Sequence, residues 1–436
     1  MTQAVTIDSL RRLARAAQAR SEPAEAARIF SQLLELSAND AEALQCVAGQ
    51  CLARGDSARG IELLTQATNI VADDAELWRR LGEARMQGGD FVQAAEALRK
   101  ALALQPDACV ARLQLGAVLE QLGHSQDALV AYYGAIRAAQ FRGQWTSAAS
   151  TPPAMRHAVH YAMGYVDRGR KQLLDAVLEP LRQSHGAAAL ERVEHCVAVH
   201  VHAREAVFPD PRQRPKFLYF PDLPSRPFYD QNRFPEHRKL ESATTLVREE
   251  LQAVLQQTQS TLEPFFGQER DVSRLLQASG SRSASWDAFF FHRYGQREQD
   301  NCRQCPQTSA LLDASPLVGI RDHAPEILFS VLRPGTRIMP HRGVTNVRLV
   351  THLPLIVPPD CALQVGGEPF VWEEGRCVTF DDTYEHEAWN HSDQTRVVLI
   401  MDSWNPDLTL VEREAIGDVI AAIGDFNGMA DVAGMA

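Results

Sequence analysis

The sequence predicts a multidomain α + β protein in which an array of α-helical repeats precedes a domain of antiparallel strands. Three observations predict this order: a 34-residue periodicity near the N-terminus, a run rich in proline and aromatic residues after Val207, and short apolar runs separated by turn residues beyond Trp286. These changes in pattern divide the chain into a repeat array over 7–142, a helical connector over 143–206 and a second folded domain over 207–420.

The N-terminal periodicity is clearest between Asp74 and Asp107, and shifts of 34 residues in either direction preserve it. Small residues recur at Gly60, Ala94 and Ala128, where they let the two helices of a unit cross closely. The segment resembles the tetratricopeptide repeat at Trp78, Leu81, Gly82, Ala94, Leu98, Ala101 and Pro106. Because one unit cannot bury its apolar face alone, the units must stack into an α-solenoid.

A concave surface that holds a peptide or a partner protein is the function expected of such an array. A spacer or a dimerisation arm without a ligand is the alternative.

The composition is that of a soluble globular protein, with 45% hydrophobic and 23% charged residues. A net charge of -11 argues against a nucleic-acid binder, which would usually show a basic face. No membrane span is expected, because no apolar run approaches the roughly 18 residues required. Asp8 interrupts the only candidate signal peptide, and the scattered cysteines form no disulfide framework, so a reducing cytoplasm is the expected compartment.

Two groups of potential metal ligands are better explained as ordinary structure. Cys302 and Cys305 form a CxxC pair, but no second pair or nearby histidine completes a zinc site, and a loop with two free thiols is expected. His195, His200 and His202 lie in a predicted helical region, where His200 and His202 fall on different faces.

His341, His386 and Arg396 fit one site in the strand-rich region. His341 begins a predicted strand, His386 follows 45 residues later, and Arg396 lies ten residues beyond it on another strand. Neutral imidazoles suit iron(II), and a guanidinium binds a carboxylate in a bidentate manner. The common iron site adds a carboxylate two residues after the first histidine, but Gly343 occupies that position here.

Several segments between Phe220 and Pro406 together resemble the aspartyl/asparaginyl β-hydroxylase family, which binds iron with two histidines and no carboxylate. They are FPDLPSRPFYD, SASWDAFFFHRYGQR, NCRQCPQTSALL, FSVLRPGTRIMPHRGVTNVRLVTHLPLIVP, WEEGRCVTFDDTYEHEAWN and RVVLIMDSWNPDLT. The resemblance implies a double-stranded β-helix of jelly-roll or cupin-like type that uses iron(II), 2-oxoglutarate and dioxygen. Family members with tetratricopeptide-like repeats before the oxygenase also exist.

The resemblance also implies roles by position. His341 and His386 would be the iron ligands, and Ser330 and Arg396 would hold the distal carboxylate of 2-oxoglutarate. His352 would contact the end of 2-oxoglutarate that chelates iron, and Trp286 would line the same pocket.

The chain departs from the family at Val350, where vertebrate members carry an arginine that also binds 2-oxoglutarate. Arg348 would share a strand face with Val350 and could compensate as a co-substrate ligand. Asp381 and Asp382 could be read as the missing carboxylate ligand, but we expect them to support His386 instead.

Hydroxylation of the β-carbon of aspartyl or asparaginyl residues, in a peptide or protein presented by the repeat array, is the expected reaction. A small-molecule or lipid acyl substrate is one alternative, and an interaction scaffold with a degenerate barrel is another. A non-oxidative enzyme with a different metal is disfavoured, because Arg396 would then have no role.

Overall fold

The computed structural model describes residues 6–257, 262–265, 275–278 and 283–432. The chain divides into two compact units, one formed by residues 1–170 with 425–436 and the other by residues 171–424.

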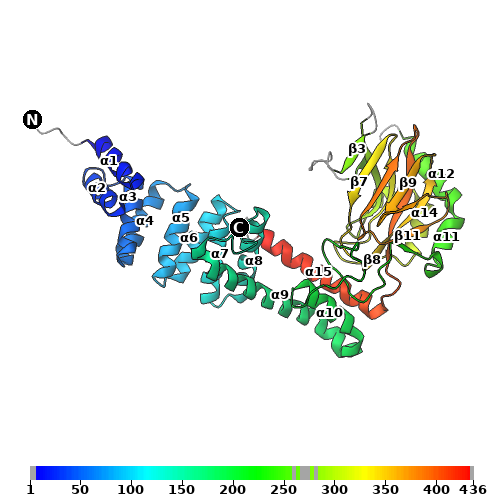
Figure 1. Cartoon of the computed structure of the whole chain (residues 1–436), viewed down its shortest axis with the longest axis horizontal. Coiled ribbons are helices and arrows are strands. Elements are labelled where there is room, and N and C mark those ends of the chain that lie inside the picture. Colours follow the sequence, from blue (N-terminus) through cyan, green and yellow to red (C-terminus); the bar gives the residue numbers. More distant parts are fainter. Residues whose placement is uncertain (1–5, 258–261, 266–274, 279–282, 433–436) are drawn as a thin grey trace, which may run out of the picture. The chain divides into compact units, whose positions relative to one another are not determined.

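The first unit contains the predicted repeat array (Figure 1). Its helices pair in chain order as α1 (Ile7–Ala19) with α2 (Pro23–Leu36), α3 (Ala41–Ala53) with α4 (Ser57–Ile70), α5 (Ala75–Gln87) with α6 (Phe91–Leu104), and α7 (Cys109–Gln121) with α8 (Ser125–Phe141). Within three pairs the turn uses a glycine of positive φ, namely Gly55, Gly89 and Gly123, spaced by 34 residues. The array therefore confirms the predicted α-solenoid.

Aspartate caps repeat with the same period. Asp40 and Asp74 accept hydrogen bonds from the first turns of α3 and α5, and Asp56 and Asp90 do so for α4 and α6. Each cap satisfies a backbone N–H that the helix itself leaves without a partner.

Small residues permit the close helix crossing that the sequence predicted. A Cβ atom on Gly82 of α5 would lie 2.6 Å from Leu98 Cγ and 3.3 Å from the carbonyl oxygen of Ala94, both in α6. A larger residue at position 82 would therefore force the paired helices apart.

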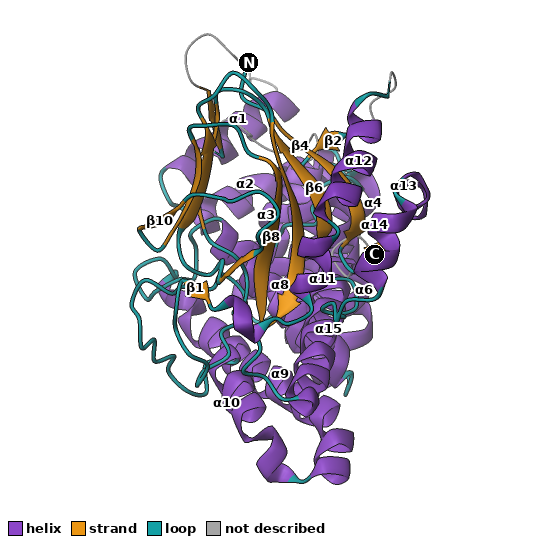
Figure 2. Cartoon of the chain, turned by 90° about the vertical axis from the view of Figure 1, so that its right-hand side faces the viewer, coloured by secondary structure: helices purple, strands orange, loops and turns teal. Residues whose placement is uncertain are grey.

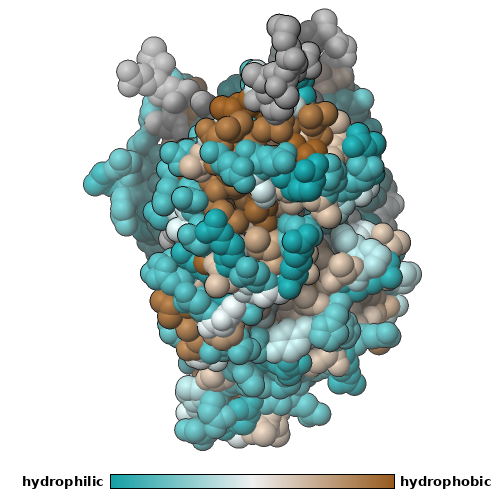
Figure 3. All heavy atoms as spheres, turned by 90° about the vertical axis from the view of Figure 1, so that its left-hand side faces the viewer, coloured by the Kyte–Doolittle hydropathy of each residue, from teal (hydrophilic) through white to brown (hydrophobic). Residues whose placement is uncertain are grey.

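The outer end of the array is largely hydrophilic, with apolar residues gathered in one area (Figure 3). Leu13 of α1 and Leu36 of α2 are the exposed large apolar residues of the first helix pair. Such a mixture is ordinary for a solvated surface.

The helices predicted over 153–205 are α9 (Arg156–His185) and α10 (Glu191–His200). The division between the two units falls inside α9, after Arg170. His195 Nδ1 donates a hydrogen bond to a carboxylate oxygen of Asp222 at 2.9 Å, in agreement with an ordinary structural role for this histidine.

Two antiparallel sheets form the centre of the second unit. The larger has the order β1 (Phe228–Tyr229), β11 (Val378–Phe380), β8 (Arg348–Ile356), β13 (Arg396–Trp404), β6 (Ile327–Leu332), β4 (Trp286–Arg293) and β2 (Glu263–Pro264), with β5 (Gln296–Arg297) paired to β4. The smaller has the order β10 (Glu368–Phe370), β9 (Cys361–Val365), β12 (His386–Asn390), β7 (Thr336–His341) and β3 (Leu276–Ala278).

From β6 to β13 the chain passes back and forth between the sheets: β6, β8, β11 and β13 belong to the larger one, and β7, the β9–β10 hairpin and β12 to the smaller. This winding is that of a double-stranded β-helix, so the predicted fold class is confirmed.

Helices cover the outer face of the larger sheet, as Figure 2 shows. They are α11 (His237–Ser242), α12 (Thr244–Leu255), α13 (Gln299–Gln304) and α14 (Pro306–Asp313). Val397, Leu399 and Met401 of β13 pack in the cluster beneath these helices, whereas Val398 belongs to the cluster between the sheets. Because side chains alternate along a strand, Arg396 shares the inner face with Val398.

The helix α12 ends at Leu255, and residues 258–261 lie outside the described part of the chain. After β13 the chain forms the helix α15 (Leu410–Val432).

The prediction of a loop at Cys302 and Cys305 is wrong, although both thiols are free. Cys302 lies in α13 and Cys305 joins α13 to α14, and both side chains are buried in the cluster against the larger sheet. Their apolar contacts explain the helical conformation that the sequence reading missed. Across the described residues, no helix is both long enough and apolar enough to cross a membrane.

Replacement of Gly82 by alanine should destabilise the repeat array. The contact with Leu98 should outweigh the gain in helix propensity and lower the free energy of unfolding by about 1 kcal/mol. The shift would be measured by following helix content during denaturation. Gly424→Ala is the control, because a Cβ atom at that helical position meets nothing within 4 Å; equal effects of both changes would contradict the account.

Candidate functional site

The two predicted metal-binding histidines meet in the smaller sheet. His341 ends β7, His386 begins β12, and the two residues are direct partners in the strand register. Their ring centroids lie 4.0 Å apart.

Hydrogen bonds orient both imidazoles. His341 Nδ1 lies 2.9 Å from the carbonyl oxygen of Met339, and His386 Nδ1 lies 3.1 Å from that of Tyr384. A carbonyl can only accept, so Nδ1 donates in each ring and Nε2 keeps its lone pair. Burial lowers the pKa of each histidine to about 4, and both rings are therefore neutral at pH 7, the form that binds a metal ion.

Trp286, Ser330 and Arg396 meet on the inner face of the larger sheet. Trp286 Nε1 donates a hydrogen bond to Ser330 Oγ at 2.9 Å. Arg396 Nη1 donates to the same oxygen at 3.3 Å and lies 3.4 Å from the Ser330 carbonyl oxygen. Three adjacent strands, β4, β6 and β13, thus bring the predicted co-substrate residues together.

Arg396 is a buried cation without a carboxylate partner among the described residues. Its side chain is 1% exposed, and its Nε has no hydrogen-bond partner. Burial lowers the pKa of Arg396 to about 10, which leaves the group charged at pH 7. An uncompensated buried charge is costly, so this arrangement favours the binding of an anion.

His352 lies near both Arg396 and His386. It is on β8, and its ring packs edge-on against Phe380 at 5.0 Å and beside Trp372 at 5.9 Å. Burial, followed by the nearby charges of Arg396 and His386, lowers its pKa well below the usual value. Its Nδ1 has no partner within the described structure and is available to a ligand.

Arg348 does not join this cluster. Its Nη1 lies 2.9 Å from a carboxylate oxygen of Asp402 and 3.4 Å from one of Asp382. Burial alone would lower the pKa of Arg348, but these two carboxylates raise it overall. The guanidinium is thereby compensated within the protein, and it is not placed to substitute for an arginine at Val350.

Asp382 fills the space that Gly343 leaves open. A Cβ atom at Gly343 would lie 2.1 Å from Asp382 Cγ, closer than any real contact allows. One carboxylate oxygen of Asp382, Oδ1, is buried without a partner. Across the described residues, no three His, Cys, Asp or Glu side chains form a metal-binding group. Asp382 therefore stands beside the histidines and is not a third ligand in this arrangement.

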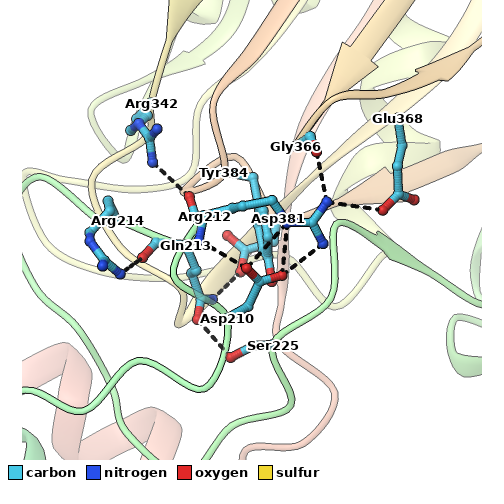
Figure 4. A network of polar contacts seen from close by, with 10 residues as sticks. All are labelled: Asp210, Arg212, Gln213, Arg214, Ser225, Arg342, Gly366, Glu368, Asp381 and Tyr384. Carbon is cyan, nitrogen blue, oxygen red and sulfur yellow. Dashed lines mark hydrogen bonds and ion pairs between the residues drawn. The ribbon is translucent and has the colours of Figure 1, made fainter.

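The segment that enters the domain braces the loop before His386, as Figure 4 shows. Gln213 Nε2 donates to Asp381 Oδ2 at 2.6 Å, and Ser225 Oγ donates to Gln213 Oε1 at 2.8 Å. The Tyr384 hydroxyl lies 3.2 Å from a carboxylate oxygen of Asp210. Because the Tyr384 carbonyl orients His386, these contacts help to fix the imidazole.

Asn346, five residues after His341, also binds this entry segment. Its side-chain amide forms reciprocal hydrogen bonds of 2.8 Å with the backbone N–H and carbonyl of Phe220.

Sequence reasoning missed Trp372. The guanidinium of Arg396 lies over its ring at 5.0 Å, and its Nε1 has no partner among the described groups. The available signal was its position in the WEEGRCVTFDD segment, but no spacing rule places it against Arg396.

Two family models match this chain, one in each of its two compact units. The family model for aspartyl/asparaginyl beta-hydroxylase matches residues 241–406, and the model for the tetratricopeptide repeat matches residues 75–108.

Curated relatives include aspartate beta-hydroxylase domain-containing protein 2 of Mus musculus, 34% identical over 48% of this chain and 60% of the relative. Ornithine lipid ester-linked acyl 2-hydroxylase of Rhizobium tropici is 36% identical over 43% of this chain and 64% of that protein. Aspartyl/asparaginyl beta-hydroxylase of Homo sapiens is 37% identical over 30% of this chain and 17% of that protein. The chain thus spans less than two thirds of the length of each of these relatives.

The crystal structure of MamA covers 32% of this chain and 82% of its own, with 18% identity and a TM-score of 0.31.

A double-mutant cycle should reveal the contact between positions 343 and 382. Gly343→Ala alone should lower the free energy of unfolding by about 1–3 kcal/mol, because its methyl group collides with the Asp382 carboxylate. In an Asp382→Ala background the same change should cost much less.

Thermal and denaturant unfolding of the four proteins would measure this coupling. Gly319→Ala is a suitable control, since a Cβ atom there meets nothing within 4 Å. Additive costs at 343 and 382 would show that the two positions do not compete for space.

Proposed function

The chain contains an aspartyl/asparaginyl beta-hydroxylase family domain behind a tetratricopeptide-repeat array, and from this we propose that it is an iron(II)- and 2-oxoglutarate-dependent dioxygenase. The observation that supports this best is the buried guanidinium of Arg396, which has no carboxylate partner among the described residues. It lies in the same domain interior as two neutral, adjacent histidines.

The residues present fit both groups. Nε2 of His341 and of His386 would hold iron(II), and the Asp382 carboxylate lies against Gly343, two residues after His341. Bound iron(II) would couple the oxidative decarboxylation of 2-oxoglutarate to the hydroxylation of an unactivated C–H bond by dioxygen.

The protein's own part is to bind and orient the co-substrate. Arg396 and Ser330 would hold the distal carboxylate of 2-oxoglutarate, and the Trp286 indole keeps the Ser330 hydroxyl in place. His352 Nδ1 would approach the other end of the molecule, nearer to His386. Because Ser330, Arg396 and His352 are buried, such an arrangement would fix the orientation of the co-substrate before reaction and limit its exposure to bulk water.

For the substrate, we propose the β-carbon of an aspartyl or asparaginyl residue in a peptide or protein. The repeat array supports this choice, because solenoids of this type offer extended surfaces to protein partners. A lipid acyl or small-molecule substrate is the second candidate. The 36% identity to ornithine lipid ester-linked acyl 2-hydroxylase of Rhizobium tropici favours this second candidate.

Turnover should require both histidines. His341→Ala and His386→Ala should each reduce 2-oxoglutarate-dependent succinate formation to background, because each removes a proposed iron ligand. His391→Ala, a change of an exposed residue at the end of the same strand, should retain activity. Wild-type activity in either ligand variant, with its fold intact by circular dichroism, would refute the assignment.

Two buried arginines should respond oppositely to replacement by methionine. Arg348→Met should destabilise the domain by about 3–5 kcal/mol, because Asp382 and Asp402 would lose their shared cation. Arg396→Met should leave the ligand-free protein as stable as wild type or more so, because it removes an uncompensated charge.

The same Arg396 variant should lose the rise in melting temperature that 2-oxoglutarate causes in the iron-loaded wild type. Thermal scans with and without 2-oxoglutarate measure both effects. A strongly destabilised Arg396→Met, or one that still responds to 2-oxoglutarate, would contradict the proposed role.

A further inference from the structure

The helices α5, α7 and α9 line a groove of about 1020 Å³ on the repeat array. Met86, Phe91, Leu113 and Met155 supply apolar walls. All of its lining residues lie between Glu76 and Tyr161, within the first unit. The groove is at the upper end of the volumes typical of small-molecule pockets, so it has room for a short peptide segment.

Among the acidic and basic side chains that line this groove, Glu120 differs from the other four in its partners. Arg79 is held between Glu76 and Glu83 at 2.6 and 2.8 Å, and Arg142 pairs with Asp107 outside the groove lining. Glu120 forms no ion pair among the described residues. Its two carboxylate oxygens instead accept hydrogen bonds from the hydroxyl groups of Tyr132, at 3.0 Å, and Tyr161.

The fourth helix pair, α7 and α8, differs from the two preceding pairs at these positions. Glu120 occupies the slot of Met86 and Leu52, one and two repeats earlier, and Tyr132 occupies that of Leu98 and Leu64. Two apolar positions have thus become a carboxylate and a phenol. A negative charge in a partly apolar wall costs desolvation energy, which a cationic ligand would offset.

Aromatic rings surround this carboxylate. Tyr132 packs against Tyr161 and Tyr165 with ring centroids 6.3 and 5.2 Å apart, in edge-to-face geometry. Tyr132 is 3% exposed and Tyr161 is 42% exposed, so only Tyr161 is free to move aside at the surface. A carboxylate beside aromatic faces is the chemical environment that a lysine or arginine side chain prefers.

We propose that the groove binds a basic, otherwise apolar segment of a partner protein, with a lysine or arginine side chain at Glu120. The cation would replace the Tyr161 hydroxyl as the partner of one carboxylate oxygen, while neighbouring apolar residues contact Met86, Phe91 and Leu113. An acidic segment would meet Glu120 unfavourably. This proposal adds a chemical class to the protein partner that the proposed function assigns to the repeat array. Its test requires neither iron nor turnover, so a negative result here can be distinguished from failure of the oxygenase assignment.

The test is fluorescence anisotropy of the full chain with two labelled peptides. One peptide has a single lysine flanked by leucines, and its match has glutamate in place of lysine. The lysine peptide should bind and weaken with added salt, whereas the glutamate peptide should not bind. Absence of binding by the lysine peptide, or equal binding of both, would overturn the proposal.

Glu120→Gln should weaken lysine-peptide binding by about tenfold, because it removes the charge but keeps the acceptor oxygen. Glu96→Gln, an exposed position of α6 outside the groove, should bind as wild type does. Tyr161→Phe should bind the lysine peptide more tightly than wild type does, because its ring remains and its competing hydroxyl is gone.

If Glu120 only fastens α9 through the tyrosine hydroxyls, Tyr161→Phe would lower the melting temperature of the array without tightening binding, and Glu120→Gln would bind like wild type. Either binding result overturns the proposal.

Discussion

The buried positive charge of Arg396 is the constraint on which the interior of the β domain depends. A guanidinium that is 1% exposed, and that has only neutral oxygen partners in Ser330, is unfavourable in the free protein. The surrounding groups lessen this cost without removing it. Trp372 offers its ring face, and the three nearby histidines carry no competing charge because burial keeps them neutral. The interior is thereby prepared for a carboxylate that the protein does not itself provide.

Arg348 differs from Arg396 because it has carboxylate partners within the protein. Its side chain is 13% exposed and lies on the inner face of a neighbouring strand, yet Asp402 and Asp382 neutralise it. One arginine therefore belongs to the framework, and the other is left for a ligand. Asp382 links the framework to the histidine pair, since its carboxylate lies against Gly343, two residues after His341. The glycine is required at that position because the carboxylate already occupies the space of a side chain.

The sequence was most informative where structure is local. The 34-residue period predicted the helix pairs because the capping aspartates, the turn glycines and the small crossing residues all act within one repeat. The spacing of His341, His386 and Arg396 also led to residues that the fold brings to one interior. This prediction depended on recognising a spacing of residues that suits known iron chemistry, because local structure alone does not indicate that β7 and β12 are neighbours.

What the sequence could not predict depends on sheet register and side-chain packing. Trp372 reaches Arg396 from a loop between β10 and β11, and the contact exists only once the two sheets face each other. The pairing of Arg348 with Asp402 requires β8 and β13 to be neighbours in a specific register. The sequence could not predict the groove at Glu120 for a related reason. The repeat pattern predicts a concave face, but only the structure shows that the partner of Glu120 on α9 is the hydroxyl of Tyr161 and not a cation.

The central claim is that the two histidines hold iron(II) while Arg396 draws 2-oxoglutarate to the same interior. Anaerobic absorption spectroscopy of the iron(II)-loaded chain tests it most directly. The account predicts a visible metal-to-ligand charge-transfer band when 2-oxoglutarate is added to the wild type, and its loss in the Arg396→Met variant. Iron(II) bound to the wild type without any such band at saturating 2-oxoglutarate would contradict it.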